Sequence, residues 1–326
     1  MPKLELEMPL LNGCGTGSYL DIFERLEKAG ACFGAYIIKS VGPFSRNPEL
    51  REKYGWEKEK LGNPNPTVTY TGSVVLNSMA LPTHPIESWI EELEKTQIKT
   101  PIIGSVWGKK PEDYPVLIRM VDPYVAAWEV NLSCPNKEAG EKQSVMEAMA
   151  SQVDAVLKPL RNATQKPIIA KLSPNEDYVA LAKIAMPHVD YICCGNTVGP
   201  GLVIDPYSRK PVLAGIRGGM SGPAMKPLIM SMVDKVHDAV KDSDVEIVAS
   251  GGIQNGLDII EYAIAGASLY ELGTCAFMEL NPEKGTAKGK AAKEIAEFTR
   301  RVGREVEEFC RHENTTLDEL VGTMQK

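Results

Sequence analysis

Short apolar runs alternate with longer amphipathic segments along most of the chain. The apolar runs are typical of strands, and they occupy residues 34–40, 74–80, 101–107, 126–133, 167–173, 190–197, 245–252 and 269–275. Segments between them, such as 85–98 and 228–241, place apolar residues at the spacing of an amphipathic helix. Strands that alternate with helices of about 10–15 residues indicate parallel βαβ units.

Eight strands of this kind predict a closed (β/α)₈ TIM barrel with long active-site loops, formed by residues 1–326 as a single domain. The strands are apolar almost throughout, as expected for strands buried on both faces. An open doubly wound sheet remains an alternative, but no GxGxxG follows the first strand. The connections 41–72 and 198–223 are too long for simple crossovers, and we expect them to be functional loops.

Composition narrows the class of protein. A formal net charge of −7 over 326 residues argues against nucleic acid as the main partner. No apolar run reaches the roughly 18 residues that would span a membrane, and the acidic N-terminus does not resemble a signal peptide. The 7 cysteines form neither a CxxC nor a cluster with histidine, which indicates free thiols and no zinc site. We therefore expect a cytoplasmic protein without a metal.

Polar residues gather where the predicted strands end, and in a barrel these ends meet on the face that carries the active site. They are Lys39, Ser40, Asn77, Ser78, Ser105, Asn131, Ser133, Lys171, Ser173, Asn196, Thr197, Gly251, Gly252, Gly273 and Thr274. Asp, Glu and His are missing from these ends. The pattern therefore argues against carboxylate acid–base chemistry and metal chemistry at this face.

Glycines at the last two strands predict a phosphate site. "SGGI" (250–253) and "GTC" (273–275) expose backbone N–H groups, and "GGMSGPAMKP" (218–227) fits a loop that closes over the same group. The alternative is that glycine ends strands in any barrel. Lys39 and Lys171 need anionic or electron-rich partners, and an ion pair with Glu129 is the alternative to a ligand. A phosphate, two lysines and several amides together fit flavin mononucleotide (FMN).

Cys134 lies just beyond a strand end, between Asn131 and Asn136. A thiol of ordinary pKa becomes a thiolate near neutral pH with modest help, although a buried cysteine can also be a small apolar side chain. A nucleophilic cysteine usually has a histidine partner, and the histidines at 84, 188, 237 and 312 lie away from the strand ends. A general base that removes a carbon-bound proton while a hydride leaves for flavin fits better.

An ordered set of motifs resembles the cytosolic class 1 dihydroorotate dehydrogenase family. The motifs are "YIIKS" (36–40), "GNPNP" (62–66), "NSMALP" (77–82), "NLSCPN" (131–136), "GNTVGPGLVID" (195–205), "GGMSGPAMKP", "SGGI" and "LGTC", and the resemblance covers residues 10–280. It implies an FMN barrel that oxidises (S)-dihydroorotate to orotate in pyrimidine biosynthesis. Cys134 would then take the C5 proton while the C6 hydride passes to flavin N5.

The resemblance also implies roles for individual residues. The substrate would be held by Lys39, Asn77, Asn131, Asn136, Asn196, Thr197 and the backbone N–H groups of Met79, Ala80 and Leu81. The flavin would be held by Cys14, Gly15, Lys39, Ser40, Asn131, Lys171, Gly195, Gly222, Gly251, Gly252, Gly273 and Thr274. The chain departs from the family at Ala80, Cys14 and Thr67, where Gly, Ser and Arg respectively are common.

Two signals disagree on the electron acceptor. "CPNKEAGEKQ" (134–143) partly matches the homodimers that use fumarate, whereas "GGMSGPAMKP" is close to the NAD-linked form, which works with an iron–sulfur and FAD subunit. We expect the fumarate-using homodimer, with the heterotetramer as the alternative. A uracil-reducing enzyme of the dihydropyrimidine dehydrogenase kind is a rival function, although "NSMALP" favours orotate. A non-redox phosphate-binding lyase or isomerase is a second rival.

Overall fold

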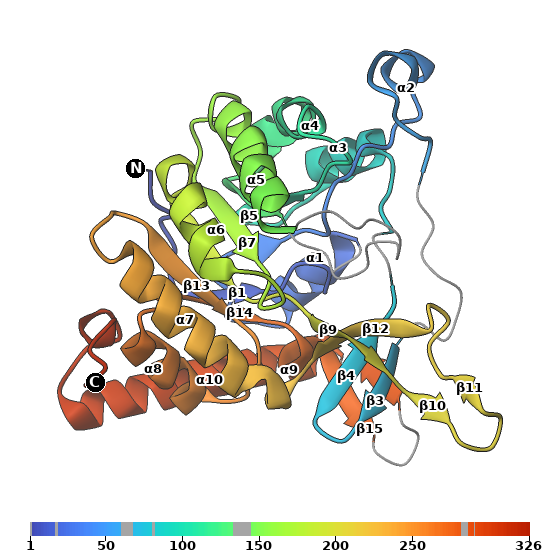
Figure 1. Cartoon of the computed structure of the whole chain (residues 1–326). Coiled ribbons are helices and arrows are strands. Elements are labelled where there is room, and N and C mark those ends of the chain that lie inside the picture. The colour runs from blue at the N-terminus through green and yellow to red at the C-terminus, as the bar shows by residue number, and fades with distance from the viewer. Residues whose placement is uncertain are drawn as a thin grey trace.

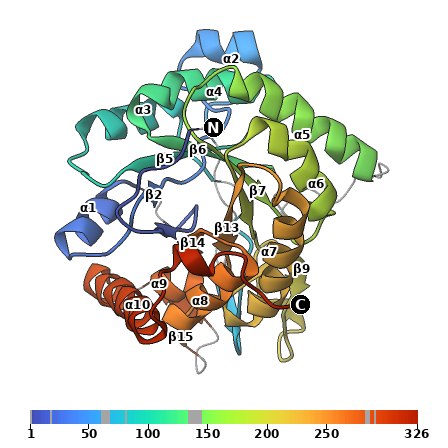
Figure 2. The same ribbon diagram turned by 90° about the vertical axis from the view of Figure 1, so that its left-hand side faces the viewer.

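An eight-stranded parallel sheet forms the centre of the structure (Figures 1 and 2). The computed structural model describes residues 2–16, 19–59, 68–79, 82–132, 145–281, 286–289 and 291–326, with only the backbone described in 145–152, 278–281 and 286–289. The strands are, in the order in which they lie side by side, β1 (Leu10–Asn12), β14 (Leu269–Leu272), β13 (Glu246–Ser250), β8 (Tyr191–Cys194), β7 (Ile168–Leu172), β6 (Ala127–Asn131), β5 (Ile102–Val106) and β2 (Tyr36–Ile37). The predicted barrel is confirmed.

Helices surround the sheet on its outer side (Figure 2). They are α1 (Asp21–Lys28), α3 (Ile86–Lys95), α4 (Asp113–Val121), α5 (Val145–Arg161), α6 (Tyr178–Ala185), α7 (Lys226–Val240), α8 (Gly256–Ala265) and α10 (Ala292–Glu313), while α2 (Pro48–Tyr54) projects from the body and α9 (Thr274–Phe277) follows β14. The periodicity of α3 explains its packing, because Ile86, Trp89 and Leu93 fall on one face and are buried. Among the described helices, none is both long enough and apolar enough to cross a membrane.

A buried asparagine helps to close the barrel between its first and last strands. β1 and the segment before β2 share a single parallel bridge, between Leu11 and Ala35. The Asn12 side chain continues this pairing: its Nδ2 donates to the Ile37 carbonyl at 2.9 Å, and its Oδ1 accepts from the Ile37 N–H at 2.7 Å. One side-chain amide thus satisfies both backbone polar groups of Ile37 on that edge.

Two apolar cores lie on the two faces of the barrel strands. The inner core contains Leu11, Ile37, Ile169 and Cys193, and Leu4 of the N-terminal segment packs against it. The outer core fills the space between strands and helices, and Cys194 belongs to it. Cys193 and Cys194 therefore point to opposite faces of β8 and are packed strand residues, as the two-residue period of a strand requires.

The prediction that 74–80 is a barrel strand is wrong. The strand there, β4 (Val74–Asn77), belongs to a four-stranded antiparallel sheet with β3 (Val68–Thr71), β12 (Arg217–Ser221) and β9 (Val198–Leu202). The missing barrel strand is β1, which has only 3 residues and gives little periodic signal. The long connections 41–72 and 198–223 thus contain strands of their own, among them the pair β10 (Ile204–Asp205) with β11 (Lys210–Pro211). A separate pair, β15 (Met278–Asn281) with β16 (Thr286–Gly289), follows the last barrel strand.

Candidate functional site

A cavity of about 560 Å³ opens where the barrel strands end. Its walls come from the carboxyl ends of the barrel strands and from β4 and β12 of the four-stranded sheet, so the two sheets enclose it together. Its size is in the range of pockets that take small-molecule cofactors and substrates. The carboxyl end of a barrel is the face on which catalytic sites are found.

Most of the sequence-predicted site residues line this cavity. They are Cys14, Gly15, Lys39, Ser40, Asn77, Met79, Asn131, Lys171, Asn196, Thr197, Gly222, Gly251, Gly252, Gly273 and Thr274. Gly195 does not line it: a Cβ at this position would lie 1.8 Å from the Ser250 carbonyl oxygen, so glycine is needed there for the close approach of β8 and β13. Ala80, Leu81, Cys134 and Asn136 lie outside the described residues, and their roles remain predictions.

Backbone groups dominate one wall of the cavity. Gly251, Gly252 and Gly273 follow the last two barrel strands, and Gly252 has a φ of +74°. A Cβ on Gly252 would lie 2.6 Å from the backbone nitrogen of Lys226, where α7 begins, so any side chain would push the loop away from the helix. The Tyr262 hydroxyl donates to the Gly251 carbonyl at 2.7 Å and fixes the orientation of the loop. Backbone N–H groups beside a helix N-terminus suit an anion such as phosphate.

Three predicted amides lie on other parts of the cavity wall. The Asn196 Nδ2 donates to the Asn131 Oδ1 at 3.3 Å, and the Asn196 Oδ1 accepts from the Thr197 N–H at 2.8 Å. Asn77, on β4, donates to the Gly219 carbonyl at 3.4 Å. Their planar amides supply donors and acceptors of the kind that recognise a ring with alternating carbonyl and N–H groups.

The two predicted lysines have different surroundings. Lys39 is partly buried in the cavity wall, and no carboxylate forms an ion pair with it among the described residues. Burial lowers the pKa of Lys39. The Lys171 Nζ, in contrast, lies 3.1 Å from the Glu129 Oε2 and 2.5 Å from the Glu271 Oε2. The ion-pair alternative is therefore correct for Lys171, which still lines the cavity, and a ligand remains the expected partner of Lys39.

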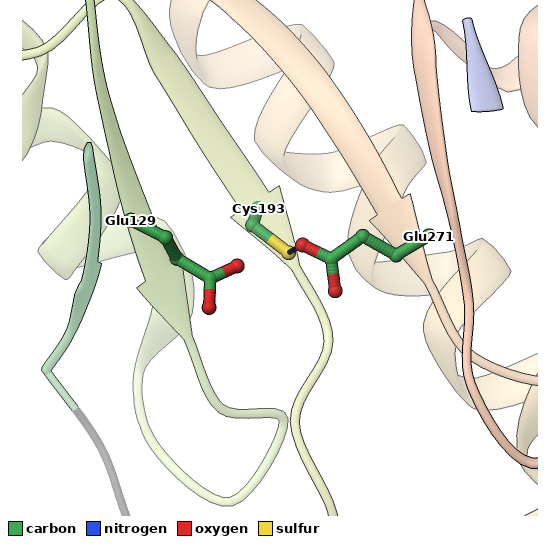
Figure 3. Close-up of side chains that lie close together, drawn as sticks. All are labelled: Glu129, Cys193 and Glu271. Atoms are coloured by element: carbon green, nitrogen blue, oxygen red, sulfur yellow. Dashed lines mark hydrogen bonds between the residues drawn. The ribbon is translucent and has the colours of Figure 1, made fainter. Parts of the chain in front are cut away.

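Carboxylates do reach this face, although none stands at a strand end. Glu271 lines the cavity, and Glu129 lies behind it, fully buried. Both side chains come from inward-facing positions within β14 and β6, and they point toward one another with Cys193 between them (Figure 3). A search confined to the last residue of each strand misses them, because they lie below the strand ends. Their sequence signal is an acidic residue inside an otherwise apolar strand.

Glu129, Cys193 and Glu271 have potential metal-ligand atoms within 4.8 Å of one another. The ammonium of Lys171 already bridges the two carboxylates, and the Cys193 thiol donates to the Glu271 Oε1 at 3.3 Å. Burial, together with the Glu271 charge, raises the pKa of Cys193 well above its usual range. The two carboxylates therefore already share a cation, the Lys171 ammonium, and the Cys193 thiol stays protonated as a hydrogen-bond donor. Lys171 thus occupies the place between the carboxylates that a metal ion would need.

Cys14 is a second neutral thiol in the cavity wall. Its Sγ lies 3.2 Å from the Ser105 Oγ, 3.3 Å from the Ser40 Oγ and 3.4 Å from the Ile38 carbonyl. Burial and the nearby Glu129 charge raise the pKa of Cys14 to about 11, so the thiol is a hydrogen-bond donor at neutral pH. The cavity residues that sequence reasoning did not select are chiefly Thr16, Trp107, Ser221, Ser250 and Glu271.

Comparisons with known proteins agree with this geometry. The family model described as dihydroorotate dehydrogenase matches residues 1–284. The catalytic subunit of dihydroorotate dehydrogenase B (NAD(+)) from Pelobacter propionicus is 37% identical over 295 residues, covering 88% of this chain and 89% of the relative. The subunit of the same name from Geobacter metallireducens is 33% identical over 332 residues, covering 99% and 96%.

The subunit of the same name from Methanocaldococcus jannaschii is 32% identical over 330 residues, covering 98% of this chain and 95% of the relative. A crystal structure of DHODH from Eimeria tenella, in complex with ferulenol, superposes with a TM-score of 0.70 at 17% identity, covering 98% of this chain and 86% of that one, and supports the fold. All three relatives carry names of the NAD(+) type, so the expectation of fumarate as acceptor finds no support. The chain belongs to the dihydroorotate dehydrogenase family.

Proposed function

We propose that this protein oxidises (S)-dihydroorotate to orotate with FMN as its cofactor, in the synthesis of pyrimidines. The observation that carries the proposal is the single cavity that the glycine-rich loop, Lys39 and the amides of Asn77, Asn131 and Asn196 line together. Family membership supplies the activity, and the cavity lining supplies groups for each part of the two ligands.

The residues fit FMN by their chemistry. Gly251, Gly252 and Gly273 would hold the phosphate, because these glycines line the cavity and Gly252 lies against the start of α7, where backbone N–H groups suit an anion. Lys171, an ammonium fixed by two carboxylates, would face the ring from the base of the cavity. The bound flavin would supply a two-electron acceptor for a hydride. The described residues provide the binding groups and no such acceptor of their own.

Substrate residues would come from other parts of the cavity lining. Asn77, Asn131 and Asn196 would hydrogen-bond the carbonyl and N–H groups of the pyrimidine ring, and Lys39 would lie beside an anionic or electron-rich atom. A site built from such amides rejects ring analogues that leave a donor or acceptor unpaired. Asn136 and the backbone N–H groups of Met79, Ala80 and Leu81 complete the proposed set, and Cys134 is the proposed general base.

The relatives favour an NAD-linked reaction for this chain. Three of them, from three different organisms, are named as catalytic subunits of an NAD(+) enzyme. We therefore propose that electrons pass from the flavin to a partner subunit that carries iron–sulfur and FAD groups, and from there to NAD. Rapid reduction of fumarate by a homodimer of this chain would contradict the proposal.

Purified protein tests the proposal in three steps. An FMN absorption spectrum at one flavin per chain is expected, and colourless protein that binds no added FMN would favour a non-redox barrel. Turnover with dihydroorotate is then compared with turnover with dihydrouracil, and faster oxidation of dihydrouracil would favour the uracil-reducing class. Rapid-mixing reoxidation of the reduced protein by fumarate, quinone and NAD, with and without a candidate partner subunit, identifies the acceptor.

The Cys134→Ala variant tests the proposed base. We expect it to keep its flavin and to lose about 10²–10⁴-fold in turnover near neutral pH, the typical contribution of a positioned base. Cys310→Ala is the matched control, since Cys310 lies on α10, far along the chain from the cavity residues. Native turnover in the variant at position 134 would show that another group takes the proton.

A further inference from the structure

The carboxylates of Glu129 and Glu271 lie beneath the cavity on either side of the Lys171 ammonium. The three side chains come from β6, β14 and β7, and their exposed fractions are 0% for each glutamate and 8% for Lys171. Figure 3 shows the two glutamates directed toward one another from opposite strands. Lys171 and Glu271 line the cavity, whereas Glu129 has no surface in it. Anything that Glu129 does for a cavity ligand therefore passes through its neighbours Lys171 and Glu271.

This group holds more acidic than basic side chains. Two carboxylates face one ammonium, and the other titratable groups that face Glu129 from the packed strands are the thiols of Cys193 and Cys14. Burial and the carboxylate charges raise the pKa of both thiols, so they add no positive charge. Full ionisation would leave one uncompensated negative charge in a buried place, which is costly. One carboxyl therefore keeps a proton.

Hydrogen bonds decide which carboxyl keeps it. Glu271 accepts from Lys171 at 2.5 Å, from the Ser250 hydroxyl at 2.8 Å and from the Cys193 thiol at 3.3 Å. Glu129 accepts from one donor, Lys171, at 3.1 Å, and its Oε1 makes no hydrogen bond with the described residues. Its side-chain hydrogen bond with Glu271 raises the pKa of Glu129 and lowers the pKa of Glu271, which favours a proton on Glu129. Donors stabilise an ionised carboxylate, so Glu271 is the anion and Glu129 the acid.

The titration of the two groups agrees with this assignment. Burial, with the adjacent Glu271 charge, raises the pKa of Glu129 to about 8. Burial alone would raise the pKa of Glu271 too, but Lys171 and the hydrogen bonds outweigh it and hold that pKa below the usual value. Among the described carboxyl groups with shifted pKa, Glu129 is the one that titrates within reach of physiological pH.

We propose that Glu129 is a proton-holding residue for the cavity. Near neutral pH it is a neutral acid beside Lys171, and at higher pH, where it has ionised, it takes a proton back from solvent when negative charge arrives in the bound cofactor. This inference rests on the proposed flavin function. Two-electron reduction of flavin with uptake of one proton leaves one added negative charge in the cavity. Where Glu129 is ionised in the oxidised protein, its carboxylate takes one further proton from solvent and becomes the neutral acid, so the added charge of the flavin is balanced.

The proposal predicts how many protons accompany reduction. Below about pH 8 Glu129 already holds its proton, and reduction takes up one proton per two electrons. Above that pH the oxidised protein has lost the Glu129 proton and reduction restores it, so two protons are taken up. Each proton makes the equilibrium constant for reduction change tenfold per pH unit.

Redox titration of the flavin-loaded protein against a reference dye, from pH 6.5 to 10, tests this. In native protein the equilibrium constant for reduction should change tenfold per pH unit near neutrality, because one proton is linked to reduction. Above pH 8 it should change up to about a hundredfold per pH unit, because two protons are linked. In Glu129→Gln the equilibrium constant should change tenfold per pH unit over the whole pH range. Glu91→Gln, which alters an exposed carboxylate paired with Arg46, is the matched control and should follow the native curve. A tenfold dependence throughout in native protein would overturn the inference.

A second measurement needs neither flavin nor a folded variant. Infrared spectra of the flavin-free native protein in deuterated buffer should show the carbonyl band of a protonated carboxylic acid at pH 7, and this band should disappear above about pH 9. Absence of the band at pH 7 would refute the proton on Glu129. Failure of the protein to bind flavin, with the band present, would count against the proposed function and leave proton holding by Glu129 intact.

Discussion

Removing the Lys171 ammonium should destabilise the fold, because it leaves two buried carboxyl groups without their cation. Lys171→Met keeps most of the side-chain volume and deletes both ion pairs, at 3.1 Å to Glu129 and 2.5 Å to Glu271. Breaking a buried ion pair by removing one partner costs about 3–5 kcal/mol. With an unfolding entropy of about 2.1 cal/mol/K per residue over 326 residues, this corresponds to a fall in Tm of about 4–7 °C.

The loss should depend on pH, and the sign follows from the two glutamates. In native protein the pKa of Glu271 is held low, so its stabilising contribution is present above the unfolded pKa and is lost as pH falls. Without Lys171 that pKa rises, and the variant then loses stability as pH increases. Glu129 is protonated below about pH 8 in native protein, and without Lys171 it holds its proton more firmly. Its contribution to the pH dependence of stability is therefore the same in native protein and in the variant between pH 5 and 7. The deficit should grow by about 1.4 kcal/mol per pH unit between pH 5 and 7.

Thermal unfolding of ligand-free native and variant protein at pH 5, 6 and 7 measures this deficit. Lys109→Met is the control, because Lys109 pairs with Glu57 at the surface and should cost less than about 1 kcal/mol. Adding Glu271→Gln to Lys171→Met should remove the pH dependence. A deficit below about 1 kcal/mol, or one that is equal at pH 5 and 7, would refute the claim that Lys171 compensates these carboxyl groups.

Two further predictions concern barrel closure and the glycine-rich loop. Asn12→Ala should cost about 1–3 kcal/mol for each polar group of Ile37 left unpaired, measured by denaturant unfolding, and an unchanged midpoint would contradict the closure role. Gly252→Ala should release bound flavin on dialysis, because the new Cβ would lie 2.6 Å from Lys226 backbone. Gly303→Ala is the control, because a Cβ at this position in α10 meets nothing within 4 Å. It should retain flavin and raise the free energy of unfolding by about 0.5–1 kcal/mol. Equal flavin retention in the two variants would refute the argument.

Sequence patterns predicted the barrel because each of its strands and helices has a local signal. Seven of the eight predicted runs contain a barrel strand, and the apolar spacing of α3 marked its buried face. The motifs at the strand ends located the cavity wall, since parallel strands of one barrel bring their carboxyl ends to the same face. The family motifs then predicted the family that the comparisons show.

Other features depend on contacts between distant segments. β1 has only 3 residues, and it joins the barrel through its ladder with β14 and the Asn12 amide, neither of which has a local pattern. β4 has the composition of a barrel strand, and only its pairing with β3 and β12 places it in the four-stranded sheet.

The chemistry of the site also has one part that the sequence determines and one part that depends on the tertiary structure. The sequence determined which residues stand at the strand ends, because the period of each strand and the position of each turn are local properties. Only the tertiary structure decided the charge beneath the cavity. Glu129 and Glu271 are 142 residues apart, and their shared ammonium comes from a third strand. Barrel closure sets which inward-facing side chains meet in one layer, and that meeting determines which carboxyl keeps its proton.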